Sequence, residues 1–132
     1  MEKESPPGSG RAVLGALAAA IFLKIFAFDF MIAQGNSMMP SVGNGAVLLV
    51  FKPYYGLRLP GASSYLLRWA KPKEGDVVVF YTPLGELAVK RCGGNRGDFF
   101  IALGDNGPHS YDSRIYGPVP ADNIIGKVLG VK

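Results

Sequence analysis

The sequence GDVVVFYTPLGELAVKRC, residues 75–92, decides the fold of this chain. Residues 76–81 are mostly β-branched and aromatic, a composition that favours strands. Residues 86–92, ELAVKRC, are the candidate partner strand, and the short link between the two runs contains Pro83 and Gly85, which are typical of turns. The stretch therefore predicts a β-hairpin.

Further short apolar runs continue this pattern at residues 46–51, 99–103 and 124–131. Short strands separated by turn residues indicate an all-β domain. The 18 Gly and 10 Pro in 132 residues also favour many turns over long helices. We expect a mainly β domain over residues 34–132.

The N-terminal part of the chain lacks this pattern of short strands and turns. Residues 12–33 are apolar apart from Gly15, Lys24 and Asp29, and as a helix they would span roughly 33 Å. We predict one transmembrane helix over 12–33, although two alternatives stay open. The uninterrupted apolar run, 12–23, is short enough for a buried core helix, and Arg11 before it also suits a cleaved signal peptide.

Residues 1–11 are charged and rich in Pro, Gly and Ser, which predicts a disordered tail. Lys3 and Arg11 precede the apolar segment and favour a cytoplasmic tail. We therefore expect a single-pass protein of the inner or plasma membrane, with its β domain on the periplasmic or extracellular side.

The charge pattern limits the partners. The 14 Lys and Arg exceed the 10 Asp and Glu, but they are scattered, so we expect no nucleic-acid partner and some attraction to membrane lipid. The single cysteine, Cys92, excludes an internal disulfide and a multi-cysteine zinc site. We expect no metal and no cofactor. Residues 53–74 carry many aromatic and leucine side chains, which either pack in the core or face a membrane.

Three segments carry candidate chemistry. Ser37 lies between Gly35 and Pro40, where a serine is usually only a turn residue. Strand alternation places Lys90 on the same face as Ala88 and Cys92, a small apolar surface on which its amine could be desolvated, although an exposed lysine is the simpler interpretation. Residues 104–114, GDNGPHSYDSR, form a polar cluster that could be no more than a solvated loop.

In order and in spacing, these segments resemble the conserved boxes of the bacterial type I signal peptidase family (leader peptidase, peptidase family S26). SMMP at 37–40 resembles the nucleophile box, GDVVVF at 75–80 the second box, VKR at 89–91 the lysine box, and residues 104–114 the last box. The resemblance implies a mainly antiparallel β catalytic domain of minimal size, carried on an N-terminal transmembrane helix.

The resemblance also implies roles for individual residues. Ser37 would be the nucleophile and Lys90 the general base, a role that requires burial to lower the pKa of the lysine. Ser110 would orient the lysine amine. The backbone N–H of Ser37 would hold the oxyanion, together with Asn36 or other backbone groups. Asp112 and Arg114 would form a supporting ion pair. Met38 and Pro40, from the nucleophile box, would also support the site.

Three residues depart from the family pattern or compete with it. Gly35 stands where some members have a serine that adds an oxyanion donor, and Ser41 stands where threonine is common. His109 could instead complete a Ser-His-Asp triad with Ser37 and Asp112, but eukaryotic-type relatives have their histidine where this chain has Lys90.

The predicted function is therefore cleavage of N-terminal signal peptides from exported preproteins, after small residues at positions −1 and −3, by a Ser-Lys dyad. One alternative is a dedicated maturation peptidase of pilin or conjugative-transfer proteins. A self-cleaving repressor of related chemistry is a less favoured alternative, because residues 12–33 would have no role in it. A catalytically silent, membrane-anchored β domain that binds lipid or a partner is the alternative from a different class.

Overall fold

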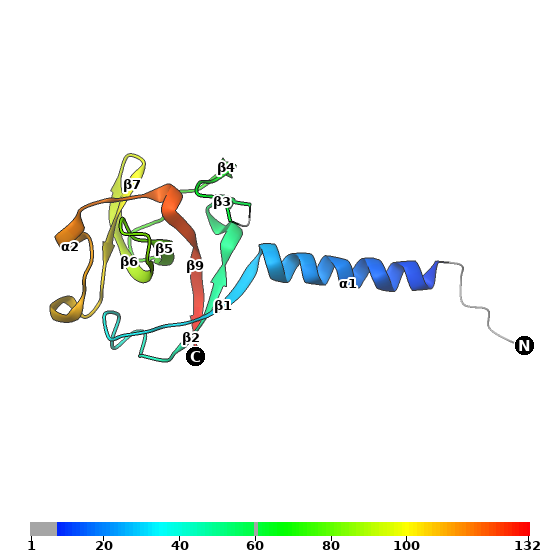
Figure 1. The fold of residues 1–132 in the computed structure, drawn as a ribbon, viewed down its shortest axis with the longest axis horizontal. Helices are drawn as coiled ribbons and strands as arrows, with labels where there is room; N and C mark the ends of the chain where they lie inside the picture. Colours follow the sequence, from blue (N-terminus) through cyan, green and yellow to red (C-terminus); the bar gives the residue numbers. More distant parts are fainter. Residues whose placement is uncertain (1–7, 60) are drawn as a thin grey trace, which may run out of the picture.

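The computed structural model describes residues 8–59 and 61–132. An N-terminal helix, α1 (Ser9–Phe26), projects from a β domain that contains the rest of the described chain, as Figure 1 shows. The chain passes from α1 into the first strand after a single residue, Ala27, so the helix is attached directly to the sheet.

Within the described residues, seven strands form one antiparallel sheet in the order β1-β2-β9-β5-β6-β7-β8. Its strands, in chain order, are β1 (Phe28–Ile32), β2 (Val47–Phe51), β5 (Val77–Tyr81), β6 (Leu87–Arg96), β7 (Phe99–Leu103), β8 (Val119–Pro120) and β9 (Ile124–Val131). A separate pair joins β3 (Gly56–Leu57) to β4 (Leu67–Arg68). Short helices complete the domain, namely η1 (Lys52–Tyr54), η2 (Gly107–His109), α2 (Ser113–Tyr116) and η3 (Ala121–Asn123).

The hairpin expected from residues 75–92 is present. Strand β5 pairs with β6 so that Val78 lies opposite Lys90, and the connection is closed by a hydrogen bond from Gly85 N–H to the carbonyl of Thr82. Gly85 has a φ of 81°, a conformation that residues with a side chain rarely adopt. The prediction of a mainly β, antiparallel domain is confirmed.

The predicted helix over 12–33 is wrong beyond Phe26. Residues Phe28–Ile32 form β1, which pairs with β2 so that Phe28 lies opposite Phe51 and Ile32 opposite Val47. Pairing with β2 satisfies the backbone groups along one edge of this segment, and the Phe28 and Phe51 rings pack 5.0 Å apart. Helix α1 also begins at Ser9, inside the predicted tail, of which residues 1–7 lie outside the described part of the chain.

The core consists of two clusters of buried side chains. One surrounds Phe80 and Phe100, whose rings meet edge to face at 5.2 Å. The other lies under β1 and β2, around Leu48 and Val50. Residues 53–74 contribute to the first cluster through Tyr55 and Tyr65. Other large apolar side chains of that segment are exposed, namely Tyr54, Leu57, Leu59, Leu66, Leu67 and Trp69, so it contains both core and surface residues.

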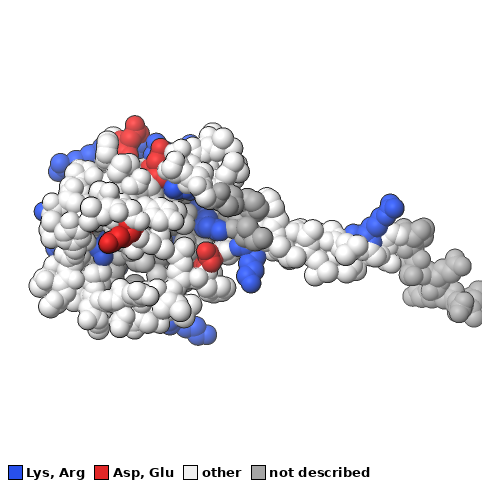
Figure 2. Space-filling view, viewed as in Figure 1, with Lys and Arg blue, Asp and Glu red and all other residues white. Residues whose placement is uncertain are grey.

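Helix α1 is apolar and is not covered by the domain. Its side chains from Ser9 to Lys24 are all exposed, including those of Leu14, Leu17 and Phe22. In Figure 2 the helix surface carries almost no charge between its two ends. Among the described residues, no helix combines the length and hydropathy required to cross a membrane, so the predicted transmembrane helix is not confirmed.

Candidate active site

The fold brings Ser37 and Lys90 together. Ser37 lies in the turn between β1 and β2, and Lys90 lies in the middle of β6. The Nζ atom of Lys90 is 2.7 Å from the Oγ atom of Ser37, within hydrogen-bond distance. A proton can therefore pass between the hydroxyl and the amine without any rearrangement of the backbone.

The environment of Lys90 favours its neutral form. Its side chain is on the inner face of β6 with Cys92, as the strand alternation predicts, and the residue is only 7% exposed. Burial lowers the pKa of the Lys90 amine, and the negative charge of Asp112 offsets part of this effect. A lysine with an ordinary pKa is almost wholly cationic at neutral pH and accepts no proton. The burial is therefore the feature that makes this amine a potential base.

The loop after β7 holds the Ser37 turn in place. The backbone N–H of Asn106 donates to the carbonyl of Ser37 at 2.9 Å, and its side-chain amide donates to the carbonyl of Asn36 at 3.0 Å. The N–H of Asp105 contacts the sulfur of Met38, which is buried. These contacts join the first and last predicted boxes and fix the backbone on both sides of Ser37.

Asp112 connects residues of the last predicted box through hydrogen bonds. Its carboxylate is fully buried and accepts hydrogen bonds from the Gly104 N–H, from the Ser110 hydroxyl at 2.7 Å and from the Arg114 backbone and guanidinium. Burial alone would raise the pKa of Asp112, but these hydrogen bonds outweigh it and hold the pKa well below its ordinary range. The expected pairing of Asp112 with Arg114 is therefore present.

Ser110 does not make the contact that was expected of it. Its hydroxyl donates to Asp112, and no hydrogen bond joins it to Lys90 within the described residues. Gly104 lies between the Ser110 side chain and the Ser37 turn. A Cβ atom there would clash with the Ser110 side chain and would lie 2.7 Å from the Ser37 carbonyl oxygen. Only glycine lets the nucleophile turn and the Asp112 cluster approach this closely.

The backbone N–H of Ser37 is the candidate oxyanion donor. The N–H of Ser37 has no acceptor among the described residues, so it is available to a developing negative charge. Gly35 has a φ of 86°, and its N–H donates to the Asn44 side chain, which closes the loop on the other side. Asn36 is exposed beside Ser37, and Pro40, joined to Met39 by a cis peptide bond, ends the turn at the surface.

Ser37 and Lys90 line a cleft of about 570 Å³. One wall is the end of β1 and the residues after it, 31–38, and the other is the start of β6 with Glu86 before it. Apolar side chains lie beside the reactive pair, among them Val42, Val79 and Ala88. His109 and Tyr111 lie along the cleft as well. Among described residues, no hydrogen bond connects the His109 side chain to Ser37 or Asp112, as the alternative triad would require.

Sequence reasoning missed the residues that position the turn. Asn106 makes two of the contacts that hold it, and Asp105 forms a two-pronged ion pair with Arg91, the neighbour of Lys90, at 2.8 and 2.9 Å. The signal was present in the sequence, because Arg91 and Asp105 each lie within a predicted box. Only the fold, however, shows that these boxes are adjacent.

The chain matches a known protein family over nearly its whole length. The model of the family described as "Signal peptidase, peptidase S26" matches residues 8–100 and 95–131, which together cover nearly the whole chain. The match includes the Ser37 turn, strand β6 and the Asp112 cluster.

Individual relatives are similar over much of the chain. Signal peptidase I of Pseudomonas fluorescens is 29% identical over 125 residues, which cover 93% of this chain and 41% of that protein. Signal peptidase I of Buchnera aphidicola is 38% identical over 86 residues, covering 59% and 27%. Mitochondrial inner membrane protease subunit 1 of Schizosaccharomyces pombe is 30% identical over 125 residues, covering 79% and 73%. The chain spans about two fifths of the length of the Pseudomonas relatives that it matches.

Proposed function

Because the chain belongs to the signal peptidase family, peptidase S26, we propose that it is a serine endopeptidase that removes N-terminal signal peptides from exported preproteins. Ser37 is the nucleophile and Lys90 the general base. The observation that carries the proposal is the 2.7 Å contact between Lys90 Nζ and Ser37 Oγ inside a cleft.

The reaction follows from the positions of these groups. The neutral amine of Lys90 takes the proton of the Ser37 hydroxyl as Oγ attacks the scissile carbonyl carbon. The Ser37 N–H donates to the oxygen that becomes negative, and Asn36 lies beside it. The lysine then passes its proton to the leaving amine, and water releases the acyl group by the same steps in reverse order. Ser110 supports the site indirectly, through Asp112.

The cleft suits an extended peptide. Strand β1 is at the edge of the sheet, and the strand pairs formed by β7 with β6 begin only at Arg91. Both β1 and residues 87–90 of β6 therefore have a backbone edge without a strand partner in the described part of the chain, and both line the cleft. A substrate in extended conformation can add to these edges through its backbone. The side chains of Ala33, Val79 and Ala88 leave space for small residues near the scissile bond, at positions −1 and −3.

Helix α1 supports a membrane location for this reaction. Its exposed apolar side chains gain roughly 25 cal/mol for each Å² that lipid removes from water. Arg11 and Lys24, near its two ends, can reach lipid headgroups. We propose that α1 contacts lipid on the periplasmic or extracellular side of the cell membrane and thereby places the cleft near emerging preproteins. Sedimentation with anionic vesicles tests this contact, and failure of the protein to bind vesicles would contradict it.

Cleavage of a preprotein by purified protein in lipid vesicles tests the activity. The wild type should release a mature chain whose N-terminus, read by mass spectrometry, follows an Ala-x-Ala site. Ser37→Ala and Lys90→Ala should each lose activity by about 10⁴-fold or more. Ser64→Ala and Lys73→Ala alter exposed residues away from the cleft and serve as matched controls. Equal activity in all five proteins would refute the dyad, and no cleavage by the wild type would favour a silent binding domain.

A panel of preproteins separates a general peptidase from a dedicated one. A general enzyme should cleave many unrelated Ala-x-Ala preproteins at comparable rates. A maturation peptidase of pilin or conjugative-transfer proteins should cleave its own class much faster than the rest.

A further inference from the structure

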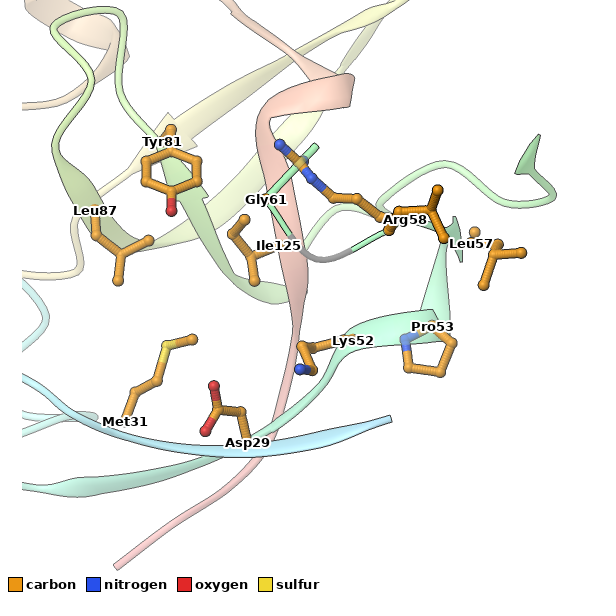
Figure 3. Close-up of a pocket in the computed structure, with 12 residues that line it drawn as sticks. Asp29, Met31, Lys52, Pro53, Leu57, Arg58, Gly61, Tyr81, Leu87 and Ile125 are labelled. Carbon is orange, nitrogen blue, oxygen red and sulfur yellow. The ribbon is translucent and has the colours of Figure 1, made fainter. Parts of the chain in front are cut away.

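A second pocket lies where helix α1 joins the domain. It has a volume of about 280 Å³, and its walls come from β1, the start of η1, residues 56–59 and 61, the β5–β6 hairpin and β9. Figure 3 shows Asp29 and Met31 of β1 on one side of this hollow, with Tyr81, Leu87 and Ile125 across from them. None of the proposed catalytic residues lines it.

The second pocket adjoins the active-site cleft. Met31 and Leu87 line both. Along β1 and the residue after it, Ala33 lines the cleft, Met31 lines both pockets and Asp29 lines the second pocket. The step from Ala33 to Asp29 is about 13 Å, the length of four residues in a strand. An extended peptide bound beside Ser37 reaches the second pocket within a few residues.

The lining of the pocket combines apolar and charged side chains. The apolar part consists of the side chains of Met31, Leu57, Leu59, Leu87 and Ile125 and the ring of Tyr81. Arg58 is engaged in the wall, because its guanidinium donates to the backbone carbonyls of Ala62, Asp122 and Ile124. Asp29 and Lys52 also line the pocket and carry opposite charges. The apolar part of the wall therefore suits uncharged side chains of moderate size.

The attachment of α1 indicates which end of a substrate enters this pocket. The chain leaves α1 at Phe26, passes Asp29 at the second pocket and arrives at Ser37 in the cleft. A signal peptide whose apolar segment shares the lipid with α1 approaches from the same side. Its residues before the scissile bond then run parallel to β1, from the second pocket toward Ser37.

We propose that the second pocket is a binding site for the substrate segment about four to eight residues before the scissile bond. It selects uncharged side chains of moderate size at these positions and adds specificity to the choice made beside Ser37. The inference rests on the proposed function, since it concerns the substrate of that reaction.

Three synthetic peptides test the inference in the full-length protein. A short peptide spans positions −3 to about +2, a second is extended to about −8 on its N-terminal side, and a third is extended by the same length on its C-terminal side. We expect the N-terminal extension to raise kcat/KM by about tenfold, the scale set by a few buried apolar groups. The C-terminal extension should give no such increase.

Tyr81→Ala removes an exposed aromatic wall of the second pocket, and Phe99→Ala, which lines neither pocket, is the matched control. The ratio of kcat/KM for the N-extended peptide to that for the short peptide should fall toward one in Tyr81→Ala and stay unchanged in Phe99→Ala. A ratio near one in the wild type, an unchanged ratio in Tyr81→Ala, or a gain from the C-terminal extension would each overturn the inference.

Binding measurements separate this inference from the proposed function. Fluorescence anisotropy of the labelled peptides with Ser37→Ala reports occupancy of the pocket without cleavage. The N-extended peptide should bind more tightly than the short peptide, and adding Tyr81→Ala should weaken its binding. This result supports the pocket whether or not the wild type is active. Absence of cleavage by the wild type would refute the activity alone.

Discussion

Lys90 Nζ and Ser37 Oγ lie 2.7 Å apart, although 53 positions separate the two residues in the chain. Two antiparallel pairings, β1 with β2 and β5 with β6, and the central strand β9 between them bring the turn and the strand together. Because Lys90 lies in a strand and hydrogen bonds from Asn106 hold the Ser37 turn, their separation is set by the fold.

The first prediction concerns pH. Burial lowers the pKa of Lys90 below its ordinary value, so the amine should become neutral, and kcat/KM should rise, at a lower pH than for an exposed lysine. A pH profile of kcat/KM from about pH 5 to about pH 10 covers this ionisation. A single acid limb with its midpoint below the ordinary lysine pKa is expected. A midpoint at that value would show that the base is not a buried lysine.

The second prediction concerns stability. The pKa of Lys90 is lower in the folded than in the unfolded chain, so burial of the cation costs stability below the folded pKa, and this cost disappears as pH rises toward the unfolded value. Lys90→Met keeps much of the stem and removes the charge. We expect it to abolish activity while raising the free energy of unfolding at neutral pH. Urea denaturation measures this difference, with the exposed Lys73→Met as the control.

The third prediction concerns the close packing at Gly104. A Cβ atom there clashes with Ser110 and the Ser37 carbonyl, so Gly104→Ala should destabilise the domain by about 1–3 kcal/mol and reduce kcat. Gly130→Ala, where a Cβ atom meets nothing within 4 Å, should leave both quantities nearly unchanged. Thermal denaturation and peptide cleavage measure the two effects. Equal behaviour of the two variants would contradict the packing described here.

The fourth prediction concerns the oxyanion site. Some relatives have a serine at the position of Gly35, but Gly35 has a φ of 86°, and a side chain there costs roughly 1–2 kcal/mol. Gly35→Ser should therefore lose stability and gain no activity. Gly43→Ser has open space and no left-handed backbone, and it should be tolerated better. An increase in kcat for Gly35→Ser would show that the loop can rearrange to supply a hydroxyl donor.

The hairpin that carries Lys90 was predictable because its pattern is local. The runs at 76–81 and 86–92 correspond to β5 and β6. On the two sides of the turn between them, the predicted boundaries agree with the observed ones within one residue. The strands at 99–103 and 124–131 were predicted with the boundaries observed. In the runs at 76–81, 99–103 and 124–131, β-branched or aromatic residues agree with the tertiary structure, and for residues 86–92 the preceding turn does so.

The start of the chain was predicted less well because its structure depends on distant residues. Phe28–Ile32 continues the apolar composition of α1, and only pairing with β2, about twenty positions later, makes it a strand. Similarly, no spacing rule indicates that Ser110 donates to Asp112 instead of Lys90, or that Asn106 holds the Ser37 turn. Such contacts depend on how loops from different parts of the chain pack together.

The unpaired edge of β1, described above as a surface for substrate, also has a consequence for the behaviour of the protein in solution. Exposed strand edges readily pair with other strands, including those of a second copy of the same chain. Phe28, Phe30 and Ile32 make this strand apolar on its outer face and increase that tendency. Concentrated samples should therefore self-associate through the cleft, and a bound peptide that covers the edge should keep them monomeric and crystallisable.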